Sequence, residues 1–295
     1  MELLSKISIT CFFASYLVSF LLEITRLFFR ARLQFVAMIG FAIAGLFAHS
    51  VFLLLRIFAD TAAQTPFASW QIWCLSVAWV LAGFYLYFAW RQPKADTGLF
   101  LLPMVLILCV AGYWLSGKTG FSSEGSSGLL ASIHGISLLL GTVAVFAGFV
   151  CGIMYLIHSA QLKAKIPVSS RFKLPSLEWL QAANERSLVF SSVLLAAGLV
   201  SGLLLNLRSS ENAVVQWSNP VVWSSALLFG WVVSATIFNW LYKPARHGRK
   251  VAYLLVASFL FLVIELVIVL SVQHASDRDQ QAAALVVSRQ EEAFR

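Results

Sequence analysis

The sequence predicts an all-α membrane protein, a polytopic bundle of about eight transmembrane helices with both termini extracytoplasmic. Of its 295 residues, 60% are hydrophobic and only 12% are charged, whereas soluble domains carry about 25% charged residues. Apolar runs of about 20 residues, the length that crosses the hydrocarbon core as a helix, recur along the chain. Basic residues gather in every second link between these runs, which indicates a fixed orientation in a membrane.

Eight apolar runs account for most of the chain. In order they are Ile7–Leu22, Phe35–Leu55, Ser69–Trp90, Leu99–Leu115, Ile133–Ile157, Leu188–Leu207, Val221–Tyr242 and Val251–Val272. Internal residues such as Pro103 and Gly141 are tolerated in membrane helices. The first run follows Lys6 without a small-residue cleavage site, so we interpret it as a retained helix. The predicted membrane domain is residues 1–276, and residues 277–295 form a polar tail.

The links after the first, third, fifth and seventh runs hold most of the Lys and Arg residues. Since cytoplasmic links carry the excess of basic residues, we place these four links in the cytoplasm and both termini outside. The net charge of +8 therefore does not require a nucleic-acid partner, because the basic residues form no continuous face. We expect a multi-pass protein of the bacterial inner (cytoplasmic) membrane, surrounded by membrane lipid.

Two segments are predicted to lie outside the bundle. Leu174–Leu180 opens with a proline and a capping serine and sets Leu177 and Leu180 on one face, which is typical of a short interfacial helix. The tail 277–295 is charged and alanine-rich, and both a helical and a disordered state are open to it. The four cysteines all lie in apolar runs without a CxxC pair, so we interpret them as small buried hydrophobic residues.

Two histidines come to the predicted outer surface from distant parts of the chain. His134 starts the fifth helix and His274 ends the eighth, level with the link Gln216–Trp223, which carries two tryptophans and a proline. Two imidazoles facing each other across a gap can ligate haem iron from both sides, and tryptophans offer a flat shelf for a planar ring. Alternatively, His and Trp at this level anchor helix ends among the headgroups. Of the other histidines, His158 and His247 face the cytoplasm.

A second candidate pair lies deeper in the membrane. His49 and Glu265 are each about 10 Å below the outer end of their helices, and ionisable groups at such depth usually face the bundle interior with a partner. One interpretation is a polar floor under an outward cavity or a proton-accepting site formed by the two. The other is a protonated Glu265 hydrogen-bonded to a neighbouring helix. Helical spacing puts Glu265 and His274 on opposite faces of the eighth helix.

Signatures of soluble enzymes are missing from the chain. It contains no P-loop, Rossmann fingerprint, HExxH or GxSxG motif, and no paired broken helices of the kind found in many secondary transporters. We therefore do not expect an autonomous enzyme.

Five segments follow one another in a recognisable order. They are Phe41–Arg56, with a histidine and a closing arginine; Ser132–Lys165, which opens near the first outer histidine; Leu174–Gly202, with LPSLExL and a terminal Ser-Gly; the tryptophan-rich Asn219–Tyr253; and Val272–Ala275, with the second outer histidine. In this order they resemble the integral-membrane cytochrome c assembly proteins (CcsA, CcmC and ResC), in particular the smaller HemX-like branch. The resemblance covers most of the chain.

Proteins of that family bind haem on the outer face, where a tryptophan-rich loop packs against the ring and two flanking histidines ligate the iron. By position, the resemblance implies His134 and His274 as axial ligands of haem b. It also implies Trp217 and Trp223, beside Pro220, as the residues of the shelf.

The chain departs from the WGxxWxWDPKE-like motif of the full haem-handling members. Asn219-Pro220 stands where Asp-Pro is expected, and Val221-Val222 replaces Lys-Glu. Since no carboxylate remains in this core, the resemblance favours haem binding over haem delivery to an apocytochrome.

The main hypothesis is a haem-binding protein of cytochrome c biogenesis that holds haem at the outer membrane face. Its partners would be a second biogenesis subunit and an apocytochrome. One alternative is a HemX-like regulator or scaffold that binds a cytoplasmic tetrapyrrole-synthesis enzyme through Lys163–Arg186 and Lys243–Lys250. Another is a small-molecule transporter that uses the level of His49 and Glu265.

Overall fold

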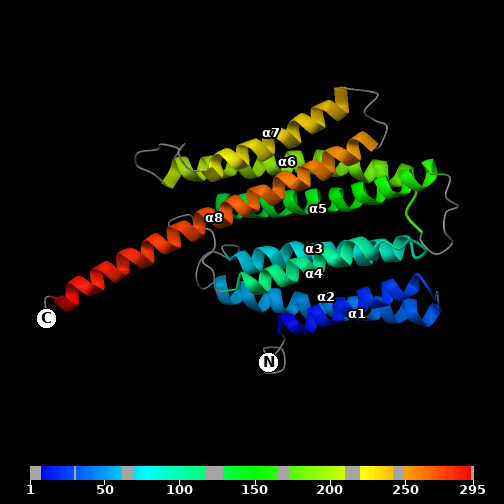
Figure 1. Ribbon diagram of the computed structural model, residues 1–295, viewed down its shortest axis with the longest axis horizontal. Helices are drawn as coiled ribbons and strands as arrows, with labels where there is room; N and C mark the ends of the chain where they lie inside the picture. Colours follow the sequence, from blue (N-terminus) through cyan, green and yellow to red (C-terminus); the bar gives the residue numbers. More distant parts are fainter. Residues whose placement is uncertain are drawn as a thin grey trace.

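The computed structural model describes residues 8–29, 31–61, 69–116, 129–164, 173–209, 220–241 and 249–293. Within these ranges every regular element is a helix. The eight helices are α1 (Ile9–Arg26), α2 (Arg32–Thr61), α3 (Trp70–Arg91), α4 (Gly98–Trp114), α5 (Leu129–Lys163), α6 (Leu177–Ser209), α7 (Pro220–Leu241) and α8 (Arg249–Ala293). They form a bundle with α1 and α2 along one side and α6 and α7 along the other (Figure 1). The predicted all-helical bundle is confirmed.

Seven of the described helices are long and apolar enough to cross a membrane. The eighth, α4, has 17 residues and extends about 26 Å, slightly less than the ~30 Å hydrocarbon core. Large apolar side chains lie exposed on the surface of the bundle, among them Leu33, Ile107 and Trp240. Exposed apolar surface on this scale suits contact with lipid rather than water. The chain is therefore a multi-pass membrane protein.

The segment for which the sequence predicts a separate interfacial helix leads directly into α6 and forms its first turn. Ser176 lies at its start, where its Oγ accepts a hydrogen bond from the Trp179 N–H at 3.4 Å. Leu180 is fully buried and Leu177 is half-buried on the same face. The capping serine and the apolar face are thus confirmed. The separate helix is wrong, because no glycine or proline interrupts the polar residues that lead from Leu180 into the membrane span.

The helix α8 runs without a break from Arg249 to Ala293. Of this length, Arg249–Ser271 is the candidate membrane span. The remainder extends away from the bundle at the end opposite the α7–α8 link (Figure 1). The backbone of the predicted tail is therefore helical as far as residue 293, which selects the helical state of the two that the sequence leaves open.

The helix α5 lies at the centre of the bundle. It packs against α6 and α8, and its contact with α3 joins it to the first four helices. A Cβ at Gly152 would lie 3.2 Å from the carbonyl oxygen of Ala252, so the glycine permits a close approach of α8. Nearby, the rings of Phe149 and Phe259 stack with their centroids 3.9 Å apart. Close packing at small residues is a main source of association between helices in lipid.

A buried ion pair within α1 contacts the link between α3 and α4. The carboxylate of Glu23, 1% exposed, lies 3.7 Å from the guanidinium of Arg26. Arg26 also donates a hydrogen bond to the carbonyl oxygen of Pro93. Because a buried ion pair needs further hydrogen bonds to offset its desolvation, this bond fixes the α3–α4 link against the end of α1.

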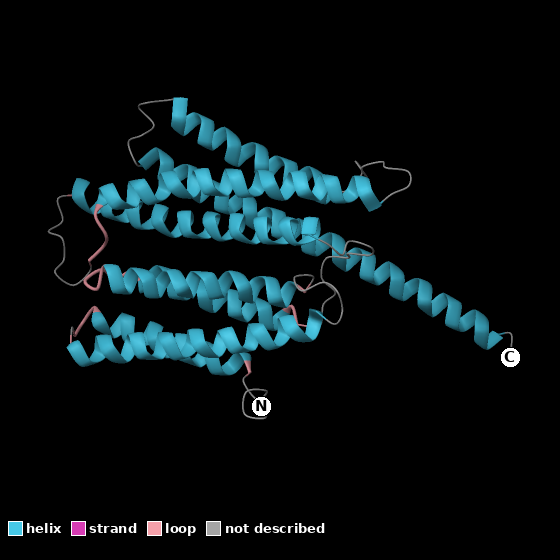
Figure 2. Cartoon of the chain, turned by 180° about the vertical axis from the view of Figure 1, so that it is seen from behind, coloured by secondary structure: helices cyan, strands magenta, loops and turns pink. Residues whose placement is uncertain are grey.

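The helix ends that flank the basic links all lie at one end of the bundle (Figure 1). Seen from behind, the described loop segments 27–29, 92–97 and 173–176 gather at this same end (Figure 2). We refer to it as the basic end, and to the end that carries the start of α5 as the opposite end. The positive-inside rule assigns the basic end to the cytoplasm, and this orientation stays a prediction.

Candidate functional site

The imidazole of His134 sits between α5 and α6 near the opposite end of the bundle. Its Nδ1 lies 2.7 Å from the carbonyl oxygen of Gly198. Because a carbonyl oxygen can only accept a hydrogen bond, Nδ1 carries the proton and donates it. In the neutral ring, Nε2 then keeps its lone pair, and it has no hydrogen-bond partner among the described residues. The histidine is half-buried.

Residues of α6 shape the space that this ring occupies. A Cβ at Gly202 would lie 2.7 Å from His134 Cε1 and 2.9 Å from Nδ1, so only a glycine leaves room for the ring there. The buried hydroxyl of Ser201 lies 2.6 Å from the Ala197 carbonyl oxygen and 2.9 Å from the Gly198 carbonyl oxygen, and its single proton is shared between them. The sequence offers one signal for this arrangement, the Ser-Gly pair at 201–202, but the pairing of α5 with α6 is needed to give it a role.

The end of the tryptophan link belongs to α7, which begins one residue before the start predicted at Val221. Pro220 is the first residue of α7, a position where proline is favoured because its missing N–H is not needed. The second half of the predicted link, residues 220–223, is therefore the first turn of a helix. The side chain of Trp223 is 61% exposed. Trp217 lies outside the described residues.

The backbone of His274 belongs to α8, whereas its side chain lies outside the described part of the chain. Two contacts fix the register of α5 against α8, because Gly152 faces Ala252 and Gly148 faces Leu255. In this antiparallel register residue 134 is level with about residue 270. Position 274 is then about one helical turn, ~6 Å, further along α8.

His49 lies in a closed aromatic site between α1 and α2. It is fully buried, and its Nδ1 is 3.3 Å from the hydroxyl of Tyr16. The ring of Phe12 stacks on the imidazole with centroids 4.2 Å apart and planes 2° from parallel. The second nitrogen, Nε2, has no hydrogen-bond partner within the described ranges.

The structure does not bring Glu265 to His49, and the proposed pair is wrong. Ser225 of α7 donates a hydrogen bond to Glu265 Oε1, and Glu265 is 9% exposed. The helices α2 and α8 lie on different sides of the bundle, with α3, α4 and α5 between them (Figure 1). The two residues lie at a similar depth, but their helices are not neighbours. A hydrogen bond to an adjacent helix, the second interpretation of Glu265, is what the structure shows.

At the basic end, His158 of α5 donates its Nδ1–H to the carbonyl oxygen of Pro175 at 3.1 Å. His247 lies outside the described residues. In the part of the chain that the structure describes, no three His, Cys, Asp or Glu side chains come together in a way that could hold a metal ion. The His134 site thus offers one nitrogen ligand, which suits a metal already held by another group, such as a porphyrin.

Comparisons with protein-family models, with curated proteins and with solved structures found no match to this chain. The fold is therefore known from the arrangement of the helices.

Proposed function

We propose that this protein binds haem at the outer face of the membrane and holds it for cytochrome c biogenesis. The observation that supports the proposal is the hydrogen bonding of the His134 imidazole. Its Nδ1–H is donated to the Gly198 carbonyl, which leaves Nε2 as a free lone-pair donor near the end of the bundle. Histidines that ligate metals almost always donate their other ring N–H to a carbonyl or carboxylate, since this fixes the tautomer and the ring orientation.

Haem would supply the iron that Nε2 coordinates. The protein would carry the haem rather than use it as a cofactor of its own. The second axial ligand in this proposal is His274, whose helix position lies within about one turn of His134 in depth. Exposed Trp223, with Trp217 and Pro220 before it in the chain, would form the apolar shelf for the porphyrin. Large aromatic side chains are suited to such contact with a planar ring.

The proposed role is to hold haem rather than to transfer it. The segment Asn219–Val222 has no carboxylate or basic side chain to contact the propionates or thiols of reacting partners. A second biogenesis subunit would therefore supply the groups that bring haem and the apocytochrome together.

The test is the haem content of the purified full-length protein, made with excess haem and measured by its visible spectrum and a pyridine haemochrome assay. We expect a Soret band in the wild type and its loss when His134→Ala and His274→Ala are combined. The matched control is His158→Ala, which removes an imidazole from the same helix α5 at its other end. Its spectrum should equal that of the wild type.

Absence of haem from the wild type under these conditions would reject the proposal. The alternative of a regulator that binds a tetrapyrrole-synthesis enzyme would then be preferred. That alternative predicts a pull-down that depends on Lys163–Arg186 and Lys243–Lys250 and is unaffected by substitution of either outer histidine.

A further inference from the structure

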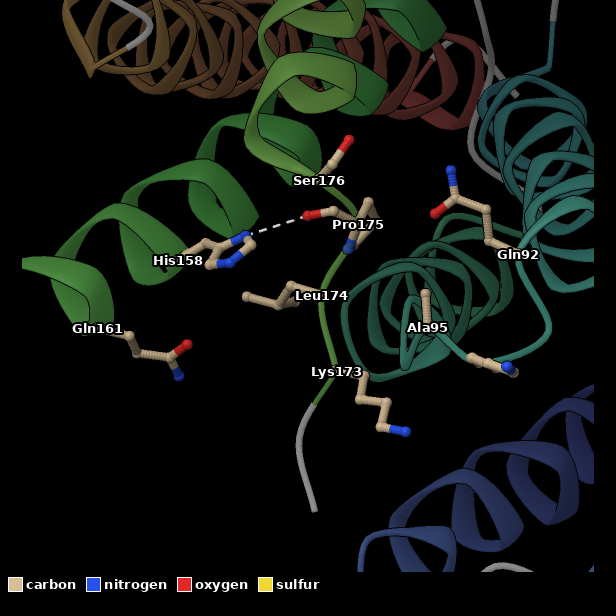
Figure 3. Close-up of a pocket in the computed structure, with 9 residues that line it drawn as sticks. Gln92, Ala95, His158, Gln161, Lys173, Leu174, Pro175 and Ser176 are labelled. Atoms are coloured by element: carbon tan, nitrogen blue, oxygen red, sulfur yellow. Dashed lines mark hydrogen bonds between the residues drawn. The ribbon is translucent and has the colours of Figure 1, made fainter. Parts of the chain in front are cut away.

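A pocket of about 520 Å³ opens at the basic end of the bundle, between the end of α5, the α3–α4 link and the segment that leads into α6 (Figure 3). Its polar lining comes from three separate parts of the chain. The residues are Gln92, Lys94, His158, Gln161, Lys173 and Ser176. This volume is within the range of ligand sites for small molecules, about 300–1,000 Å³.

Hydrogen bonds hold the walls of the pocket in place. The Lys173 N–H donates to Asp96 Oδ2, and the Asp96 N–H donates to the Lys173 carbonyl, each at 2.8 Å. On the other side, His158 donates to the Pro175 carbonyl (Figure 3). The segment 173–176 is thus tied to both α5 and the α3–α4 link. A site whose walls are ordered before binding loses less entropy when a ligand enters.

The formal charges of the lining are all positive. Lys94 and Lys173 carry ammonium groups, Gln92 and Gln161 carry amide N–H donors, and Ser176 carries a hydroxyl. None of the described lining residues has a carboxylate. Asp96, the nearest acidic neighbour in the chain, is fully buried and its Oδ2 accepts the Lys173 N–H. The formal charge of the pocket is therefore positive, and its amide and hydroxyl groups can donate as well as accept, which suits a multiply charged oxyanion.

We propose that this pocket binds a phosphate group, either of an anionic phospholipid headgroup or of a soluble phosphate compound. Phosphate fits better than a single carboxylate, because it carries more negative charge and more acceptor oxygens to meet the two lysines and the amide and hydroxyl donors of the lining. Basic pockets between membrane helices on the cytoplasmic side are a known means of holding anionic headgroups. The site lies at the end of the bundle away from His134 and does not depend on haem binding.

The experiment measures thermal stabilisation of the full-length protein in a non-ionic detergent. The probes are dioctanoyl-phosphatidylglycerol, inorganic pyrophosphate and, as a zwitterionic comparison, dioctanoyl-phosphatidylcholine. A ligand that binds the native state raises the melting temperature with increasing concentration. We expect a saturable rise with phosphatidylglycerol, with pyrophosphate or with both, and a clearly smaller one with phosphatidylcholine. The probe that acts identifies the source of the phosphate.

Substitutions of single residues test whether the ligand binds in this pocket. Lys173→Gln should weaken the apparent affinity by about tenfold, the effect of losing one charge-assisted hydrogen bond. Gln161→Leu keeps every charge and should also weaken it. The matched control is Lys163→Gln, which removes the same charge from an exposed position of α5 that does not line the pocket. No saturable rise with either anionic probe would overturn the proposal, as would equal weakening by Lys163→Gln and Lys173→Gln.

Discussion

Asp96 and Lys173 exchange two hydrogen bonds although 77 positions separate them in the chain. Each donates its backbone N–H to the other, one to a carbonyl oxygen and one to a carboxylate oxygen, and both distances are 2.8 Å. The pair joins the α3–α4 link to the segment that leads into α6. It thereby ties the first four helices to the last four at the basic end.

The first prediction concerns this pair. Asp96→Ala should lower the free energy of unfolding by about 1–3 kcal/mol, because it removes a part-buried hydrogen bond from the Lys173 N–H to a carboxylate. Asp96→Asn keeps one oxygen that can accept this bond and should lose less. Melting in detergent, followed by helical circular dichroism, measures both. Equal losses in the two variants would show that the negative charge, not the hydrogen bond, stabilises this link.

The second prediction concerns the room around His134. Gly202→Ala places a Cβ 2.7 Å from His134 Cε1, so the ring must turn and its bond to Gly198 must lengthen. We expect a lower melting temperature and, if the protein binds haem as proposed, a reduced Soret band. Gly83→Ala is the control, since a Cβ there meets nothing within 4 Å and alanine is the better helix former. A Gly202→Ala protein as stable as this control would contradict the described packing.

A third prediction tests the role of Glu265. Glu265→Gln keeps an oxygen that can accept the Ser225 hydrogen bond, so stability and haem content should stay near those of the wild type. Glu265→Leu should remove that bond, at a cost of about 0.5–2 kcal/mol for a polar contact between membrane helices. Comparison of melting temperatures measures the difference. A transporter that uses the charge of Glu265 would instead lose its flux already in Glu265→Gln.

The fourth prediction concerns orientation. In a variant with its four cysteines replaced by alanine, we introduce Ser116→Cys at the end of α4 or Lys163→Cys at the end of α5, both exposed positions. The positive-inside rule predicts that a membrane-impermeant maleimide labels position 116 in intact cells and position 163 only after lysis. Labelling in the reverse order would put His134 in the cytoplasm and remove the basis for an outer haem site.

The helices were predictable because long apolar runs allow little else in a membrane. The sequence places the sixth span at Leu188 because the residues before it are polar, whereas α6 begins at Leu177 and Asn184 within it is fully buried. The pairing of His49 with Glu265 failed for a different reason. Spacing along a helix gives depth, but it does not reveal which helices are neighbours.

The features that the sequence could not predict all depend on contacts between distant segments. Gly202 acquires a role only when α6 packs against His134, and the phosphate pocket exists only when Lys173 meets Asp96. The Ser-Gly pair at 201–202 is the only local signal for the first contact, and neither Lys173 nor Asp96 stands out by type or by local spacing. In each case the chemistry comes from the pairing of elements rather than from a motif.

The unbroken helix α8 has a mechanical consequence. Its 45 residues measure about 67 Å, and the part beyond Ser271 reaches about 33 Å past the membrane span. Inside the bundle the same rod carries Ser258, which accepts the indole N–H of Trp231, and Glu265, which accepts the Ser225 hydroxyl. A force applied to the projecting arm, which is about as long as the membrane span of the same helix, would therefore act as torque on these two bonds.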